Sequence, residues 1–490
     1  MHLPSDINSC HKLILEQQNQ IEQFSKEMEE LRVLIMSQSV RITELESQLG
    51  QNSRNSHKPP STDGYRKTVA LPKAKGKKTG GQKGHKGRTL QIVATPDVVE
   101  ELLPTQCECG AVLVKEGAQV LEVRQEFDIP PPKLVVREYR KLGCACGVCG
   151  RHNEGVFPSE IKARVQYGIG VQTLVVLLGT VYKVPMKKIR QLFHDVYGYE
   201  VNESTIQSAT QRCYTRLAAS EKSIREKITQ SVVAFFDETG IRVAGKLRWL
   251  HTACTQLYTH LFTHDKRGKK ALMDSASIMP AFTQYAMHDC LSSYFSFTQC
   301  SHAVCGAHLL RELTALEEQG RVWAGVFKKF LLDLYEQTQQ GKGQLSESEQ
   351  QKTLSHYNQI WQQGDAEEPP PEVPEKGKRG KAKATKGRNL LIRLQKYQSA
   401  VLAFAFHEHV PFTNNEAERA LRPAKIKIKV AGCFRTEEGS QWYARILGFV
   451  ATARKHDRNV FTELRLAFSG QTFLTPVSYT HLRAHETVLD

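Results

Sequence analysis

A short apolar run that ends in two carboxylates places the strongest constraint on the fold. Residues 231–239 read Ser-Val-Val-Ala-Phe-Phe-Asp-Glu-Thr, and a run of this length between polar residues predicts a buried strand. The strand would hold Asp237 at the rim of a hydrophobic core, and Glu238 would leave it on the opposite face because side chains alternate. The alternative is that Asp237 only begins a turn.

Two more apolar stretches follow this run and predict an antiparallel sheet. They cover residues 247–254 and 257–262 and are separated by turn signals, so residues 232–262 are expected to form three antiparallel strands. A helix is expected over residues 270–285. Residues 285–289 then repeat the first pattern, a short apolar stretch that ends in Asp289. Two such aspartates in one sheet can project into the same site.

A third carboxylate lies in the segment 412–423, which reads Phe-Thr-Asn-Asn-Glu-Ala-Glu-Arg-Ala-Leu-Arg-Pro. Thr413 and Glu416 have the spacing of a capping box, which would use Glu416 to close the start of a helix. Glu418 lies beyond that role. It either forms an exposed ion pair with Arg422, one turn later on the same face, or acts as a ligand beside the two aspartates.

The first 50 residues carry a heptad pattern. Apolar residues alternate at steps of three and four for about five repeats, with Gln17 and Gln38 in the two vacant seam positions. This spacing predicts a coiled coil over residues 8–50, and hence a homodimer or higher homo-oligomer. A single amphipathic helix packed on its own protein is the alternative. The apolar seam consists of Ile14, Ile21, Phe24, Met28, Leu31, Ile35, Ile42, Leu45 and Leu49.

The chain of 490 residues carries 67 Lys and Arg against 51 Asp and Glu, a formal net charge of +16. This excess favours an acidic partner, nucleic acid in particular. Residues 51–95 are a basic linker with little to bury, which either contacts DNA phosphates without reading sequence or is a soluble spacer. No apolar run reaches the roughly 18 residues that span a bilayer, and residues 1–20 lack an apolar signal core. We therefore expect a cytoplasmic protein that does not bind a membrane.

Five of the 12 cysteines lie close together, in Cys107-Glu-Cys109-Gly and Cys144-Ala-Cys146-Gly-Val-Cys149-Gly. Two strands expected at residues 120–130 and 133–140 would fold back at three prolines and bring the two groups together. The pattern predicts a structural Zn²⁺ in a module over residues 96–160, bound by four of the five thiolates. Cys107, Cys109 and Cys149 are the surest ligands, and Cys144 and Cys146 compete for the fourth place. The alternative is a set of free cysteines in a core.

A smaller group of metal-binding side chains occurs later in the chain. Cys300, Cys305 and His308 lie close together in sequence, yet they lack a clear fourth ligand. We expect them to pack near the wall of the site rather than to bind a second zinc ion.

Residues 161–229 predict a helical domain. Helices are expected over residues 171–181, 186–196 and 203–217, the last capped by Asn202. The turn at residues 197–199 could belong to a helix-turn-helix that enters a DNA groove, but plain helical packing explains the same pattern.

Five further motifs occur along the chain. They are Asn-Ser-x-x-Ser-x-Lys-Pro-Pro-Ser at 52–61, Gly-Gly-Gln-x-Gly-His-x-Gly at 80–87, Cys-x-x-His-Leu-x-Arg-Glu at 305–312, Asn-Asn-x-Ala-Glu-Arg at 414–419 and Gly-Cys-Phe-Arg-Thr-Glu-Glu-Gly at 432–439. Together with the heptads, the cysteine module and the Asp-Glu-Thr at 237–239, they resemble the transposases of the insertion-sequence-66 family, a branch of the DDE recombinases. The resemblance covers residues 14–468, and residues 469–490 stay unassigned.

The resemblance implies a mixed α/β (α+β) protein with an RNase H-like catalytic domain over residues 230–468, interrupted by a helical insertion at about residues 307–390. It implies that Asp237, Asp289 and Glu418 hold two Mg²⁺ or Mn²⁺ ions. The implied partner is DNA, both the ends of the element and the target, with accessory proteins and the bacterial nucleoid as further expectations. Basic residues near the glutamate could hold DNA phosphates or form a solvated face: Arg419, Arg422, Lys425, Lys427, Lys429, Arg435 and Arg445.

The function expected from the sequence is metal-dependent DNA strand cleavage and strand transfer by a DDE-type transposase. One alternative is a non-catalytic, zinc-containing DNA-binding protein whose carboxylates are structural. Another is a metal-dependent nuclease that cuts without joining. Three acids beside a phosphate give a pure DNA binder no advantage, because like charges repel.

Overall fold

The computed structural model describes residues 6–49, 55, 90–104, 106–116, 118–340, 344–371 and 384–474. Residues 1–64, 162–190 and 201–490 belong to one compact unit, and residues 65–161 and 191–200 belong to a second. The first unit contains a five-stranded sheet, and the second contains a two-stranded sheet.

The five-stranded sheet has the order β5-β4-β3-β6-β7. β3 (Val233–Val243), β4 (Lys246–Cys254) and β5 (Thr259–His264) are antiparallel, which confirms the three predicted strands. β6 (Tyr285–His288) pairs with β3 in parallel, which confirms the strand predicted from the apolar stretch before Asp289. β7 (Ser301–Val304) pairs in parallel with β6, and the sequence pattern does not predict it.

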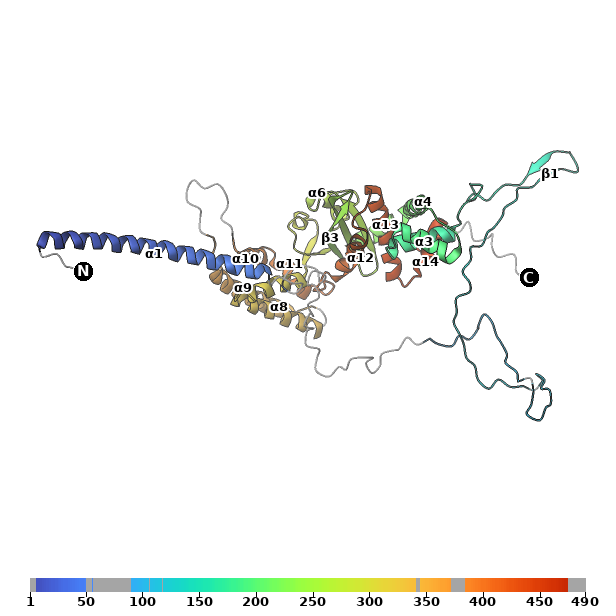
Figure 1. Ribbon diagram of the computed structural model, residues 1–490, viewed down its shortest axis with the longest axis horizontal. Coiled ribbons are helices and arrows are strands. Elements are labelled where there is room, and N and C mark those ends of the chain that lie inside the picture. Colours follow the sequence, from blue (N-terminus) through green and yellow to red (C-terminus); the bar gives the residue numbers. More distant parts are fainter. Residues whose placement is uncertain are drawn as a thin grey trace. The chain divides into compact units, whose positions relative to one another are not determined.

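Both faces of the sheet are buried. Phe235 and Phe236 lie in separate hydrophobic cores, because neighbouring side chains of a strand point to opposite faces. α12 (Asn415–Ala431) packs on β3 and β4, and α13 (Glu437–Lys455) packs on β5 (Figure 1). Leu421 of α12 and Leu447 of α13 join the sheet residue Leu250 in one core. These two helices fix the position of the third predicted acid, Glu418, relative to β3.

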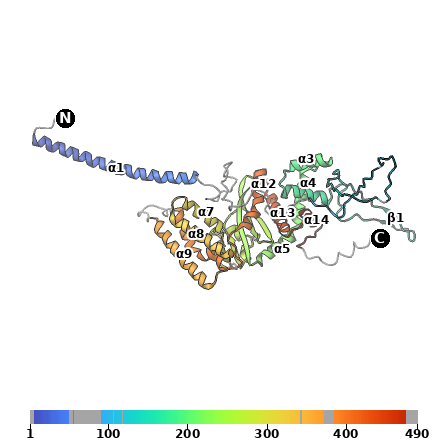
Figure 2. The same cartoon turned by 90° about the horizontal axis from the view of Figure 1, so that it is seen from below.

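A group of helices follows β7 and packs beside the sheet (Figure 2). Their apolar side chains, including the fully buried Trp323 and Phe327, share a core with Met287 of β6. Most of the described residues between 307 and 390 are helical, as expected for the predicted insertion. The helices are α7 (Gly306–Glu317), α8 (Val322–Gln340), α9 (Glu347–Glu367), α10 (Lys386–Lys396) and α11 (Gln398–Phe406).

Residues 161–229 are largely helical, as predicted. The helices are α2 (Ile169–Val176), which continues as a π-helix (Leu177–Val181), α3 (Met186–Tyr197), α4 (Glu203–Arg216) and α5 (Ala218–Thr229). Asn202 occupies the N-cap position of α4, although its side chain makes no capping hydrogen bond. Among the described helices, none is both long and apolar enough to cross a membrane.

The helix predicted for residues 270–285 is wrong. The segment contains only the short α6 (Lys269–Leu272) and a 3-10 turn (Met279–Ala281). Asp274 accepts a hydrogen bond from the Ala276 N–H (2.8 Å), which offers the backbone an alternative to the helical pattern.

The heptad segment forms α1 (Ile7–Leu49), a helix of 43 residues. Its predicted seam is exposed along the length of the helix, with Phe24 63% and Leu31 53% accessible. The helix is confirmed, and its self-association stays a prediction.

The strands predicted for the cysteine module are wrong. Residues 120–130 and 133–140 form no strand, and the pairing instead joins β1 (Gly143–Ala145) to β2 (His152–Glu154). The three prolines at 130–132 explain the difference, because proline lacks an N–H donor and holds the backbone extended instead of turning it back.

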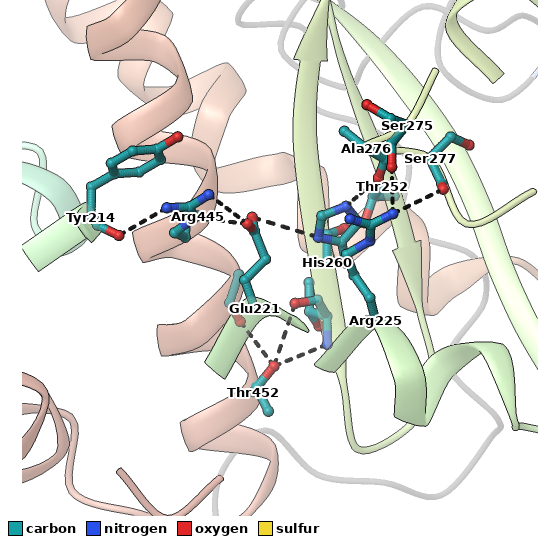
Figure 3. Close-up of polar contacts among 12 residues, drawn as sticks. Tyr214, Glu221, Arg225, Thr252, His260, Ser275, Ala276, Ser277, Arg445 and Thr452 are labelled. Carbon is teal, nitrogen blue, oxygen red and sulfur yellow. Dashed lines mark hydrogen bonds and ion pairs between the residues drawn. The ribbon is translucent and has the colours of Figure 1, made fainter. Parts of the chain in front are cut away.

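A buried polar network joins α4 and α5 to β5 and α13 (Figure 3). Arg445 donates to Glu221 (Nε to Oε2, 2.8 Å) and to the Tyr214 carbonyl (3.0 Å), and its guanidinium lies 3.7 Å from the centroid of the Tyr214 ring. Glu221 Oε1 lies 3.9 Å from His260 Nδ1, and His260 Nε2 lies 2.8 Å from the Ala276 carbonyl oxygen. These contacts engage Arg445 inside the protein, so the expectation that it holds a DNA phosphate is wrong.

His260→Gln is expected to reduce the acid sensitivity of the fold. Burial lowers the pKa of His260 to about 4; Glu221 opposes this shift, whereas Arg225 and Arg445 add to it. An unfolded histidine titrates near 6.5, so the unfolded state binds more protons between pH 6.5 and pH 4, and stability falls as the pH falls through this window. Urea unfolding at several pH values in this window gives the unfolding free energy as a function of pH. The slope of that free energy against pH should be smaller in the variant by up to about 1.4 kcal/mol per pH unit. An unchanged slope, equal to that of the exposed control His194→Gln, would contradict this role for His260.

Candidate active site

Asp237 and Asp289 meet where the parallel part of the sheet ends. The ladder between β3 and β6 stops at Phe235 and Met287, two residues before each aspartate. β3 itself continues to Val243 in its hairpin with β4, so the expectation that Asp237 ends a strand is wrong. Asp289 follows β6 directly, as predicted.

The carboxylates at this position form a tight cluster. Oxygen atoms of Asp237, Glu238 and Asp289 lie within 4.8 Å of one another. Burial, followed by the charges of Glu238, Asp289 and Glu418, raises the pKa of Asp237 to about 8, although the Glu238 N–H donates a 2.8 Å hydrogen bond to its Oδ1. Such repulsion between buried acids is relieved by a bound cation.

Glu238 stays with this cluster, contrary to the expectation from strand alternation. Its fully buried carboxylate accepts hydrogen bonds from Arg267 Nε and from the Tyr294 hydroxyl, both at 2.8 Å. The same guanidinium lies 3.7 Å from Asp289 Oδ2 and 5.1 Å from the ring centroid of Trp249. Because both Glu238 oxygens already have donors, Asp237 and Asp289 are better suited to bind a metal ion.

The start of α12 is anchored next to Asp237. The buried Asn414 is the N-cap of this helix, and its side-chain amide donates to the Phe236 carbonyl (2.8 Å) instead of capping. The predicted capping box is therefore wrong. Glu416 forms ion pairs with Arg419 (3.2 Å) and Lys455 (3.3 Å), because it lies on the side of α12 that faces Lys455 of α13.

Glu418 lies one turn into α12 and faces α7. Its Oε1 is 3.6 Å from an Arg311 nitrogen and 3.9 Å from His308 Nε2, so its partners come from the insertion and not from Arg422. This oxygen is buried and has no hydrogen-bond donor. Glu418 lies outside the 4.8 Å group of acids, yet its charge raises the pKa of Asp237.

The residues present fit the divalent ions that the resemblance implies. Carboxylate oxygens are the donors that Mg²⁺ and Mn²⁺ prefer. Asp237 and Asp289 offer closely spaced oxygens, and the buried Glu418 Oε1 lacks a donor. Burial and the neighbouring carboxylates raise the pKa of Asp237, and a bound cation would act against this shift by stabilising its charged form.

Gly306→Ala is expected to displace the start of α12. The Gly306 N–H donates to the Phe412 carbonyl (2.8 Å), and an added Cβ would lie 2.2 Å from the Phe412 ring. Overpacking of this kind costs about 1–3 kcal/mol, and urea unfolding would measure the loss. In the control Gly170→Ala, where no atom lies within 4 Å of the new Cβ, stability should rise by about 0.5–1 kcal/mol. Equal stability of the two variants would contradict the tight packing at Gly306.

Four charged residues follow one face of α12. Glu418, Arg422, Lys425 and Lys429 are spaced by four, three and four residues, which is the repeat of a helix face. The three basic residues are exposed. Lys427 lies on the opposite side, where its ammonium is 3.5 Å from the Gly179 carbonyl oxygen and burial lowers its pKa. Lys427 is therefore only partly exposed, whereas Arg419 and Arg435 are exposed.

The candidate acids and this basic face lie within a matched family region. Residues 164–442 match the model of a family described as Transposase IS66 family. This chain belongs to the IS66 transposase family. Residues 11–91 match a family of unknown function, and no curated protein matches the chain. Membership implies a transposase function, and hence DNA binding, as the sequence motifs predict.

The cysteine module of this IS66 family transposase lies outside both matched regions. The Ala111 N–H and the Cys107 thiol lower the pKa of Cys109, and backbone N–H groups of Cys149 and Val148, with the Cys149 thiol, lower the pKa of Cys146. A lowered pKa favours the thiolate, which is the form of cysteine that binds metal ions. Within the described part of the module, however, no three of the five thiols come within 4.8 Å of one another.

Sequence reasoning missed the basic residues that face the acids. Arg267 follows β5 and lies in no motif, and only the sheet topology brings it to Glu238 and Asp289. Arg311 lies within the motif at 305–312, but its spacing gives no sign that it faces Glu418.

Proposed function

We propose that this IS66 family transposase cleaves DNA strands and transfers them to target DNA, using two divalent ions held by Asp237, Asp289 and Glu418. The observation that carries the proposal is the cluster of closely spaced acids, in which burial and then the charges of the neighbouring carboxylates raise the pKa of Asp237 to about 8. If these acids had only a structural role, their repulsion would destabilise the fold and serve no function.

The sheet order supports an RNase H-like catalytic domain over residues 230–468. Three antiparallel strands followed by two parallel ones place the first acid on the central strand and the second after its parallel neighbour. The third acid comes from a helix packed on the central strand, after an insertion of helices.

Two bound Mg²⁺ or Mn²⁺ ions would stabilise the attacking and leaving oxygens of an in-line displacement at phosphorus. Asp237 and Asp289 would supply oxygen ligands from the rigid sheet, and α12 would supply Glu418. Arg267 and Tyr294 keep Glu238 engaged, so that it does not compete for the ions. The exposed Arg422, Lys425 and Lys429 would bind DNA phosphates along α12, because they continue the face that begins at Glu418.

The direct test is incubation of the purified chain with DNA that carries the ends of the element and with Mg²⁺. Strand transfer predicts joined products that disappear in Asp237→Asn. Cleavage without joining would favour a nuclease. Binding without any cleavage, unaffected by the substitution, would identify a non-catalytic DNA-binding protein.

Three further parts of the function are proposals of the same kind. The two cysteine pairs would bind one structural Zn²⁺ if residues 96–160 bring them together. The helices of residues 161–229 could enter a DNA groove. α1 would join copies of the chain through its exposed seam.

A further inference from the structure

A second set of metal-binding atoms lies beside the acidic cluster. Cys305 Sγ, a nitrogen of His308 and an oxygen of Glu418 all lie within 4.8 Å of one another. Cys305 is the N-cap of α7, His308 lies in the first turn of α7, and Glu418 lies in the first turn of α12. The sequence showed no clear fourth ligand for Cys300, Cys305 and His308. The fold brings the Glu418 carboxylate to Cys305 and His308 from more than a hundred residues away, and Cys300 is not part of this group.

The three donors are held by backbone contacts between the two helix starts. The Asn414 N–H donates to Cys305 Sγ (3.2 Å), and the Gly306 N–H donates to the Phe412 carbonyl (2.8 Å). Burial raises the pKa of Cys305, but backbone N–H groups of Asn414, His308 and Ala307 act in the opposite direction. N–H donors at a helix start also stabilise a thiolate once a metal ion has displaced its proton.

The donor set differs in chemistry from the acidic cluster. One sulfur, one imidazole nitrogen and one carboxylate oxygen suit Zn²⁺, whereas Mg²⁺ prefers oxygen ligands alone. Three protein ligands with a fourth position left for water form a familiar zinc arrangement. The neighbouring Arg311 would oppose a cation, but its side chain is 29% exposed and can turn toward solvent.

We propose that Cys305, His308 and Glu418 bind a single Zn²⁺ ion, and that this ion keeps Glu418 from joining Asp237 and Asp289 at the Mg²⁺ site and so inhibits the enzyme. The inhibitory half of the proposal rests on the function proposed above, because it requires Glu418 to serve the Mg²⁺ site. The binding half does not. One glutamate cannot be placed for both sites at once, so Zn²⁺ and productive Mg²⁺ binding would exclude each other.

The binding half is tested with Co²⁺, a coloured substitute for Zn²⁺, on the full chain after removal of metal by a chelator. The wild type should bind one more Co²⁺ per chain than Cys305→Ser and should show a stronger thiolate-to-cobalt charge-transfer band. Cys213→Ser, which also alters a fully buried cysteine, should bind like the wild type. Cys146→Ser should lose only the contribution of the cysteine module. Equal binding by the wild type and Cys305→Ser would overturn the site, whether or not the protein cleaves DNA.

The inhibitory half is tested by adding Zn²⁺ to DNA cleavage reactions that contain Mg²⁺. For each variant, the cleavage rate with Zn²⁺ is compared with its own rate without Zn²⁺. Cys305→Ser should need at least about ten times more Zn²⁺ for half inhibition, since losing even an outer-shell partner weakens metal binding 10–100-fold. Equal zinc sensitivity would overturn inhibition through this site. If Cys305→Ser does not fold, His308→Asn provides the same comparison with the thiol retained. A wild type that binds the extra Co²⁺ but never cleaves DNA would refute the proposed function and leave the zinc site standing.

Discussion

Asp237→Asn should lower the rate of Mg²⁺-dependent DNA cleavage by more than about 100-fold. Even the loss of an outer-shell partner of a metal ligand lowers metal affinity or activity 10–100-fold. The amide keeps the shape of the side chain but removes the charge that holds a divalent ion. DNA binding in the absence of metal should not weaken, since the substitution removes a negative charge. The measurement is cleavage and joining of labelled element ends, with the exposed Asp333→Asn on α8 as a matched control.

The same variant has a second readout that needs no DNA. In the metal-free wild type, the pKa of Asp237 is raised from 3.8 to about 8, so the native state binds more protons than the unfolded state between these values. Stability therefore falls as the pH rises from about 4 to about 8, and Asp237→Asn should lack this part of the fall. Added Mg²⁺ should stabilise the wild type at pH 8 by binding the folded state, and the variant much less.

The two readouts separate failure of the site from failure of the reaction. A variant that keeps full cleavage would refute the assignment of Asp237. A wild type stabilised by Mg²⁺ that produces no joined DNA would leave the metal site in place and favour an alternative function.

The strands that position the two aspartates could be predicted from the local sequence pattern. The apolar runs around Asp237 and Asp289 predict β3 and β6 because each run matches the length of a buried strand. The helix predicted between those runs, over residues 270–285, was wrong, because the Asp274 side chain accepts a hydrogen bond from the backbone and favours a turn. β7 was missed because its residues include the polar pair Ser301 and His302.

The contacts within the site depend on tertiary structure that the sequence does not display. Asn414 occupies the N-cap position of α12, but its amide donates to the Phe236 carbonyl instead of capping the helix. The predicted capping box therefore does not form. The partners of Glu418 come from α7 rather than from Arg422 on its own helix. Helical spacing alone, however, does place Lys427 on the face opposite Glu418, whereas its contact with Gly179 depends on the tertiary fold.

Met28→Asp combined with Leu31→Asp should convert the protein from an oligomer to a monomer. Both side chains lie in the exposed seam of α1. Burial of a side chain of this size contributes about 1.5–3 kcal/mol, and a dimer would lose four of them while gaining four buried charges. Light scattering after size-exclusion chromatography measures the mass. The control Val33→Asp with Met36→Asp introduces the same charges at exposed positions of α1 outside the seam, and it should remain an oligomer.

The monomeric variant also tests whether joining needs two copies of the chain. The seam lies in α1, while the acids lie on β3, after β6 and on α12, so the substitutions leave the catalytic residues unchanged. If each copy holds one end of the element, the monomer should still bind single ends and should lose the paired joining of two ends. A seam variant that is monomeric and joins paired ends at the wild-type rate would show that α1 serves another partner. A seam variant that stays oligomeric would contradict the coiled coil itself.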